Sequence, residues 1–153
     1  MDHQKFSYVS YIRTTPEELW EALTGSEFTR QYWMGNRVES DWRPGSSVKF
    51  IATDGRLVLL GKVLDCDKPK VLSYTWSYQI DEAMRAEKPS RVTFRLERFA
   101  PNSELVKLTV THDEFPDNSL VFPQISSGWP MVLSGLKTLL ETKHGIIVQG
   151  YCE

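Results

Sequence analysis

Between Val38 and Val110 the chain alternates between apolar and polar residues, and this period of two constrains the fold most. Successive side chains of a strand point to opposite faces of a sheet, so such alternation predicts strands with one buried and one exposed face. The clearest run, residues 72–78, has its aromatic residues in one phase and its serines and threonine in the other. Short turns, among them the hairpin signal Asp54-Gly55, separate the runs. We therefore predict an antiparallel meander.

The segment before the alternating region predicts one strand and two short helices. Residues 6–12 are rich in aromatic and β-branched side chains, which favour a strand. Thr15 can cap a helix that begins at Pro16, and Glu18 can complete a capping box. Gly25 then ends this helix and precedes a second short one.

The segment after the alternating region predicts one long helix. Apolar residues from Trp129 to Leu140 recur at helical spacing. Because Pro130 has no N–H to donate, it fits only in the first turn of a helix. We therefore predict that this helix begins near Ser126 and is about 18 residues, or about 27 Å, long. Residues 117–125 are then a loop.

This order of elements predicts an α+β fold. A curved antiparallel sheet of about six or seven strands would wrap around the long C-terminal helix, with the two short helices after the first strand. Residues 1–153 are expected to form one domain, since domains cluster near 100–150 residues. A sheet that grips a helix often fails to close fully against it, so we expect a hydrophobic cavity between the two.

Charge, hydropathy and cysteine content exclude several classes of function. The 18 basic and 20 acidic residues give a formal net charge of −2 without a block of like charge, so no nucleic-acid binding is expected. No window approaches the roughly 20 apolar residues of a membrane helix, and the N-terminus lacks signal-peptide features. We therefore expect no membrane insertion and a cytoplasmic location. Cys66 and Cys152 lack the spacing of a disulfide framework or a zinc site.

Aromatic residues make up 12% of the chain, which is more than a core of this size needs, so some of them are expected to line a ligand site. Strand phase and helix spacing point one set of side chains to the same interior. We predict that the ligand-binding residues are Phe50, Tyr74, Trp76, Phe94, His112, Trp129 and Leu133. The rim of this pocket is predicted to hold Tyr32, Trp33, Trp42 and Phe122. The alternative is that these side chains form only the core.

His112 ends the last alternating run, so its ring is expected on the inner face together with Glu114. It can act as a general base or hold a ligand carboxylate. The alternative is a core histidine whose ring is hydrogen-bonded to a backbone carbonyl. His3 and His144 lie near the termini and offer no metal-ligand spacing. No nucleophile, zinc-protease or phosphate-loop motif occurs, so we predict no catalytic residue, no metal and no cofactor.

Six segments in this order resemble the helix-grip (START-like, SRPBCC) superfamily. They are Thr15–Thr24 (TPEELWEALT), Tyr32-Trp33, Asp54-Gly55 followed by Gly61–Leu64, Leu72–Trp76, Leu108–His112 and Gly128-Trp129. Within that superfamily they are most similar to the branch named after the activator of the heat-shock protein ninety ATPase. The resemblance covers roughly Ser7 to His144.

The resemblance implies a domain that binds a small apolar or amphipathic molecule between the sheet and the C-terminal helix. A first alternative is a co-chaperone-like interaction module whose partner is a chaperone ATPase. A second is an enzyme of the cyclase or dehydratase kind that uses His112 as its base. The polar outer phase of the strands, for example Ser73, Thr75 and Ser77, argues against an apolar docking patch at that place.

Overall fold

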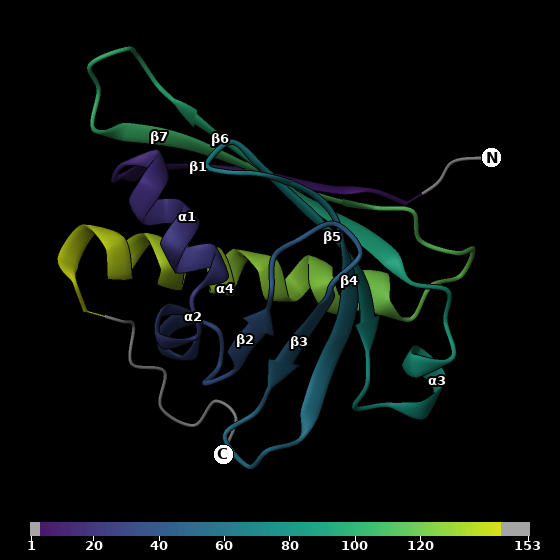
Figure 1. Ribbon diagram of the computed structural model, residues 1–153. Helices are drawn as coiled ribbons and strands as arrows, with labels where there is room; N and C mark the ends of the chain where they lie inside the picture. Colours follow the sequence, from purple (N-terminus) through teal and green to yellow (C-terminus); the bar gives the residue numbers. More distant parts are fainter. Residues whose placement is uncertain (1–3, 145–153) are drawn as a thin grey trace.

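Seven antiparallel strands form one curved sheet in the part of the chain that the computed structural model describes, residues 4–144 (Figure 1). The strands are β1 (Phe6–Arg13), β2 (Arg37–Ser40), β3 (Ser47–Ile51), β4 (Leu57–Asp67), β5 (Val71–Tyr78), β6 (Ser90–Arg98) and β7 (Leu105–Asp113). The helices are α1 (Pro16–Thr24), α2 (Ser26–Tyr32), α3 (Glu82–Arg85) and α4 (Val121–Thr142). The spatial order of the strands is β1-β7-β6-β5-β4-β3-β2. The predicted α+β helix-grip fold is confirmed.

The sheet bends where β4 runs between β3 and β5. Register shifts interrupt the pairing of β4 with both neighbours, and such irregularities bend and twist a strand. A side chain at Gly61 would overlap the carbonyl oxygen of Thr75, so only glycine permits this close approach of the two strands. The Thr75 hydroxyl also accepts a hydrogen bond from the N–H of Lys62 at 2.9 Å.

The first helix begins and ends where the sequence predicts, whereas the second begins at Ser26 and has no side-chain cap. The Thr15 hydroxyl accepts a hydrogen bond from the N–H of Glu18 at 3.1 Å, and Pro16 occupies the first turn. The Glu18 carboxylate accepts from the Thr14 hydroxyl, outside the predicted capping box. Gly25 separates α1 from α2.

The C-terminal helix begins earlier than predicted. α4 has 22 residues and starts at Val121, so the predicted loop over residues 117–125 is partly helical, and Pro130 lies inside the helix rather than in its first turn. The Ser119 hydroxyl caps the helix by accepting from its first two N–H groups, each at 3.1 Å. One proline removes one helical hydrogen bond, and burial of the apolar stripe of α4 compensates for this loss.

α4 crosses one face of the sheet, with α1 and α2 beside its C-terminal half (Figure 1). This half is closely packed: a Cβ at Gly135 would lie 3.3 Å from the Cβ of Tyr32. The Lys137 ammonium group donates to the carbonyl oxygen of Tyr11 at 2.6 Å, so α4 also covers the free edge of β1. Any open space between the sheet and α4 is therefore expected beside the N-terminal half of this helix.

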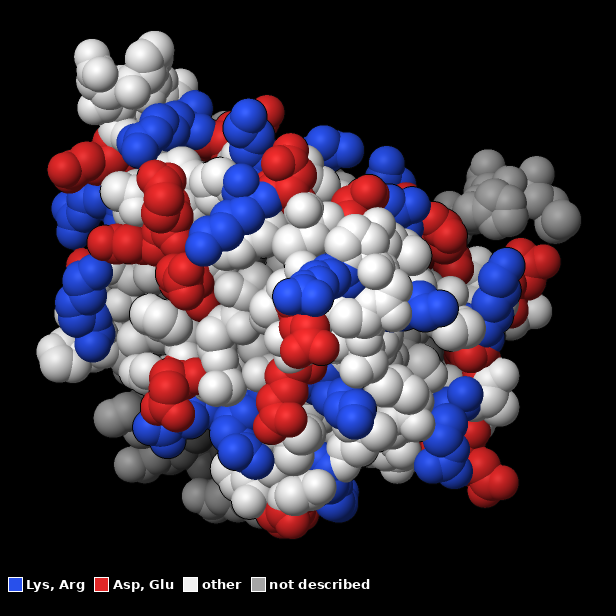
Figure 2. All heavy atoms as spheres, in the orientation of Figure 1, with Lys and Arg blue, Asp and Glu red and all other residues white. Residues whose placement is uncertain are grey.

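The surface carries charges of both signs. Figure 2 shows basic and acidic side chains interspersed over one face of the molecule. That face has no extended basic area of the kind that binds the phosphate backbone of nucleic acids. Within residues 4–144, no helix has the length and apolar composition needed to cross a membrane.

Candidate functional site

A small hollow, here called the tryptophan hollow, lies between β5 and the N-terminal half of α4. Its volume is about 20 Å³, which is room for about one water molecule. Its walls are formed by Trp33, Met34, Trp76, Tyr78, Ile125, Gly128, Trp129 and Val132. No acidic or basic side chain is among them, so its polar groups are those of the backbone and of its aromatic side chains.

Three indole rings dominate the walls of this hollow. Trp33 follows α2, Trp76 belongs to β5 and Trp129 belongs to α4. The ring centroids of Trp33 and Trp129 are 5.3 Å apart, those of Trp76 and Trp129 are 5.4 Å apart, and those of Trp33 and Trp76 are 6.2 Å apart. Each side chain is buried, with at most 6% of its residue exposed. Aromatic pairs at such distances attract one another, so the three elements hold the walls together.

The hollow opens beside Gly128 and Met34. A Cβ at Gly128 would meet no atom within 4 Å, which contrasts with the tight contact at Gly135. Met34 is 38% exposed and lies in a left-handed turn with Gly35, at φ values of 53° and 77°. A flexible thioether side chain and a glycine therefore flank the opening.

A buried chain of hydrogen bonds, here called the polar chain, joins Ser90, His112 and Trp129. The Trp129 indole N–H donates to Nδ1 of His112 at 3.1 Å. Because an accepting ring nitrogen carries no proton, the neutral ring bears its proton on Nε2 and donates it to the Ser90 hydroxyl at 2.8 Å. Burial lowers the pKa of His112 to about 3, so the ring stays neutral at physiological pH.

His112 is therefore held as a structural histidine. Its ring is fully buried, and its nitrogens pair with two side chains, not with the backbone carbonyl that the sequence alternative assumed. Glu114 does not share its face as predicted, because a φ of 62° turns the chain there and the carboxylate lies 3.7 Å from Arg91. A general base needs access to its substrate and a pKa near the working pH. This arrangement disfavours the use of His112 as a base.

The indole N–H of Trp76 is in a different environment. Trp76 is 4% exposed, and its Nε1 has no hydrogen-bond acceptor among the described residues. Its ring meets the rings of His112 and Tyr78 edge-to-face, with centroid distances of 5.0 and 5.7 Å. An N–H group over a ring face is held more weakly than one bonded to oxygen or nitrogen. Trp76, one of the residues that line the hollow, therefore carries a buried donor without a partner.

The predicted ligand-binding residues all lie inside the fold, and Trp76 and Trp129 line the hollow. The others are core residues with at most 1% exposure: Phe50, Tyr74, Phe94, His112 and Leu133. Burial raises the pKa of the Tyr74 phenol above its ordinary value, so this group stays neutral. Side chains therefore occupy most of the space that was predicted as a cavity.

The predicted rim residues do not stay together. Trp33 lines the hollow. Tyr32 is 7% exposed and donates its hydroxyl hydrogen to a carbonyl of α1 at 2.6 Å. Trp42 donates its indole N–H to the carbonyl oxygen of Thr24 at 3.1 Å, and Phe122 lies in the first turn of α4. None of the last three predicted rim residues lines the hollow.

Sequence reasoning missed five lining residues: Met34, Tyr78, Ile125, Gly128 and Val132. Tyr78 shares the phase of Trp76, so the alternation of β5 contained its signal. Ile125 was missed because its segment was predicted as a loop. Ser90, the far end of the polar chain, joins the site through strand register, in which it pairs with Trp76.

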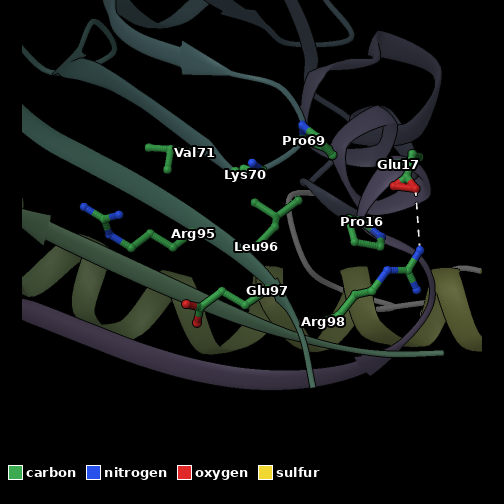
Figure 3. A pocket seen from close by; sticks show the side chains of 9 residues that line it. All are labelled: Pro16, Glu17, Pro69, Lys70, Val71, Arg95, Leu96, Glu97 and Arg98. Atoms are coloured by element: carbon green, nitrogen blue, oxygen red, sulfur yellow. Dashed lines mark ion pairs between the residues drawn. The ribbon is translucent and has the colours of Figure 1, made fainter. Parts of the chain in front are cut away.

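A larger hollow lies by the N-terminal end of α1 (Figure 3). It has a volume of about 540 Å³ and is lined by Pro16, Glu17, Pro69, Lys70, Val71, Arg95, Leu96, Glu97 and Arg98. Glu17 and Arg98 form an ion pair at 3.7 Å, drawn as a dashed line in Figure 3. None of the predicted site residues lies there.

Metal-ligating side chains do not converge in the described chain. Among residues 4–144, no group of three histidine, cysteine, aspartate or glutamate side chains could hold a metal ion. Cys66 is half-buried and free, whereas Cys152 and His3 lie outside the described residues.

A family model matches most of the sequence. The model, described as Activator of Hsp90 ATPase homolog 1-like protein, covers residues 13–141, a range that holds every lining residue of the tryptophan hollow. The chain belongs to this family. The resemblance found in the sequence is thereby confirmed. Among curated proteins, none matches the chain.

Several solved structures share the fold of this Activator of Hsp90 ATPase homolog 1-like domain. A protein from Mesorhizobium loti is 27% identical, with a TM-score of 0.74 over 91% of this chain and 98% of that one. An Aha1 dimer from Colwellia psychrerythraea is 20% identical, with a TM-score of 0.73 over 93% and 99% of the two chains. An HSP90 activator from Plasmodium falciparum is 20% identical, with a TM-score of 0.72 over 90% and 96%. The last two likenesses show the fold alone.

Membership of the Activator of Hsp90 ATPase homolog 1-like family supports, in general terms, a START-like ligand-binding domain or an Aha1-like module. The two roles use different parts of the molecule. A ligand-binding domain would use the interior, where the tryptophan hollow lies, and an interaction module would use the outer face of the sheet.

Proposed function

We propose that this domain binds a small apolar or aromatic molecule at the tryptophan hollow. The observation that carries the proposal is the arrangement of three indole rings around a space that opens beside Gly128. Apolar and aromatic walls with few polar groups are typical of small-molecule sites. The START-like architecture of the family supports the same assignment.

Binding requires the hollow to widen, because about 20 Å³ admits only one water molecule. The Met34 side chain is exposed and lies outside the packed core, so it can move. Gly128 has no side chain, and a Cβ there would meet no atom within 4 Å. Phe50, Phe94 and Leu133 are fully packed deeper in the fold. We therefore infer a ligand that enters at the opening and lays its apolar end against the indoles.

Tryptophan fluorescence and thermal melting test this proposal. Neutral aromatic compounds, fatty acids and sterols are titrated as separate classes. We expect at least one class to change the tryptophan emission, because three of the rings line the site, and to raise Tm, because a ligand of the native state stabilises it. If no class changes either signal, the proposal is wrong.

A pair of leucine substitutions on α4 then locates the binding site. Gly128→Leu places a side chain in the opening of the hollow, whereas Ser134→Leu adds the same side chain at an exposed position of the same helix. We expect Gly128→Leu to weaken binding by about tenfold or more, equivalent to about 1.4 kcal/mol. Ser134→Leu should leave the affinity unchanged. Equal effects of the two variants would place the ligand elsewhere.

A second candidate function is a co-chaperone-like interaction module, which we propose on the basis of the outer face. Tyr11 and Phe99 pack edge-to-face there at 5.8 Å, and Val9 shares the outward phase of Tyr11 on β1. All three are exposed, by 45% for Val9, 43% for Tyr11 and 62% for Phe99. Exposed apolar clusters often mark protein contacts. This candidate includes the cytoplasmic location that the sequence predicts.

The partner for this candidate is an ATPase of the heat-shock protein ninety class, since one structural relative is described as an activator of it. The double variant Tyr11→Ser/Phe99→Ser should abolish any stimulation of ATP turnover by the domain. Leu64→Ser is the matched control, because Leu64 is an exposed apolar residue on β4. Turnover that the domain never changes would eliminate the candidate.

A further inference from the structure

The unpaired indole N–H of Trp76 carries more information about the ligand than the apolar walls do. Folded proteins pair nearly all buried polar groups, and a buried donor without an acceptor costs about 1–3 kcal/mol. Trp76 has such a donor among the described residues, and the same residue lines the tryptophan hollow. An acceptor that arrives with a ligand would recover this cost.

In the described chain no neighbouring polar group supplies that acceptor. The Trp129 indole N–H is itself a donor, and Nδ1 of His112 already accepts from it. Nε2 of His112 carries a proton that goes to Ser90. The rings of His112 and Tyr78 meet the Trp76 ring edge-to-face, and an N–H···π contact is weaker than a hydrogen bond to oxygen or nitrogen. The polar chain is therefore complete without Trp76.

From this geometry we infer that the ligand carries an uncharged hydrogen-bond acceptor, such as a ketone, ester or amide carbonyl, which pairs with the indole N–H of Trp76. The inference rests on the proposed function and adds the chemical class of the ligand. No lysine or arginine lines the hollow, and His112 beside it is neutral. A carboxylate would lose its hydration there without gaining a cation, which is costly.

Three probes of nearly equal shape test this inference in the wild-type protein. They are 2-acetylnaphthalene, which has a carbonyl acceptor, 2-isopropenylnaphthalene, in which a methylene group replaces the carbonyl oxygen, and 2-naphthoate, which is charged. We expect 2-acetylnaphthalene to bind about tenfold more tightly than the isopropenyl compound, as expected for one recovered hydrogen bond. The naphthoate should bind more weakly than the ketone.

The indole N–H resonances of ¹⁵N-labelled tryptophan provide a direct readout. The Trp76 signal, assigned from its absence in Trp76→Phe, should move downfield with 2-acetylnaphthalene and not with the isopropenyl compound. Trp76→Phe should also abolish the tenfold preference. Trp42→Phe is the matched control, because Trp42 is away from the hollow and its N–H is already bonded to Thr24. That variant should keep the preference.

Each outcome decides a different statement. Equal binding of the ketone and the isopropenyl compound, with no shift of the Trp76 signal, would overturn the acceptor inference and leave the proposed function intact. Tighter binding of the naphthoate would overturn the requirement for an uncharged ligand. If no probe binds and the Trp76 signal never moves, the inference is overturned, and the three-class titration with fatty acids and sterols then decides the proposed function by itself.

Discussion

Trp129 and Trp76 lie side by side at the tryptophan hollow, yet they differ in one hydrogen bond. Their ring centroids are 5.4 Å apart, and both residues are at most 4% exposed. The N–H of Trp129 belongs to the polar chain and orients His112, whereas the N–H of Trp76 has no acceptor in the described chain. Burial is therefore the same for a tryptophan that completes the fold and for one that keeps a donor available. Only the pairing of the two N–H groups separates them.

Phenylalanine substitutions at these two positions should separate them most clearly. Trp129→Phe removes buried volume and leaves Nδ1 of His112 without its donor, so we expect a loss of about 3 kcal/mol in the free energy of unfolding. Trp76→Phe removes a similar volume together with an unpaired donor, so we expect a loss of about 1 kcal/mol. Urea denaturation followed by circular dichroism measures both values.

Ser90→Ala is the control for this difference. It removes the other hydrogen bond of His112 without changing any aromatic ring, and should cost about 1–2 kcal/mol. If the two phenylalanine variants lose equal stability, the hydrogen bond of Trp129 contributes nothing and the contrast between the tryptophans fails.

Low pH should also lower the stability of the fold through the hydrogen bond of Trp129, because only that indole is bonded to a titratable ring. Burial lowers the pKa of folded His112 to about 3 from its ordinary value of 6.5. Between these values the unfolded chain binds a proton that the folded chain does not, so stability present above pH 6.5 is lost as the pH falls. We expect this group to remove about 2 kcal/mol between pH 7 and pH 5 in urea unfolding experiments.

Two variants show whether His112 causes this loss. His112→Leu should be less stable at neutral pH but should lack this part of the pH dependence, whereas Trp76→Phe should retain it. Carboxyl groups with ordinary pKa values titrate mainly below pH 5, so they contribute little over this interval. An identical pH dependence in wild type and His112→Leu would assign the loss to other groups.

The elements that the sequence predicted correctly are those encoded by neighbouring residues. The period of two in β5, the Thr15 cap of α1 and the break at Gly25 all depend on contacts within a few positions. The predicted start of α4 was wrong because part of the cap of this helix comes from a residue that is distant in the sequence. The Glu87 carboxylate accepts from the Ser119 hydroxyl at 2.6 Å and from the next N–H at 2.7 Å. A local rule about Pro130 had no access to that contact.

The site was predictable to the extent that strand phase and helix spacing place side chains on one face. These patterns brought Trp76 and Trp129 to the interior, where both line the hollow. They could not distinguish a filled core from an open one, because that depends on how side chains from separate elements fit together. Nor could they show which indole is paired, since the partner of His112 on β6 is fixed by strand register.

Gly128 and Gly135 compare an open and a closely packed position of α4, and substitutions there have the smallest expected effect. Replacing glycine by alanine inside a helix stabilises it by about 1 kcal/mol. At Gly128 the new methyl group meets no atom within 4 Å, so Gly128→Ala should realise that gain as a higher Tm. At Gly135 the methyl group lies 3.3 Å from the Tyr32 Cβ and 3.4 Å from its carbonyl oxygen, so crowding should offset the gain. Equal gains would mean that α4 packs alike at both positions, and the tryptophan hollow would then have no opening beside Gly128.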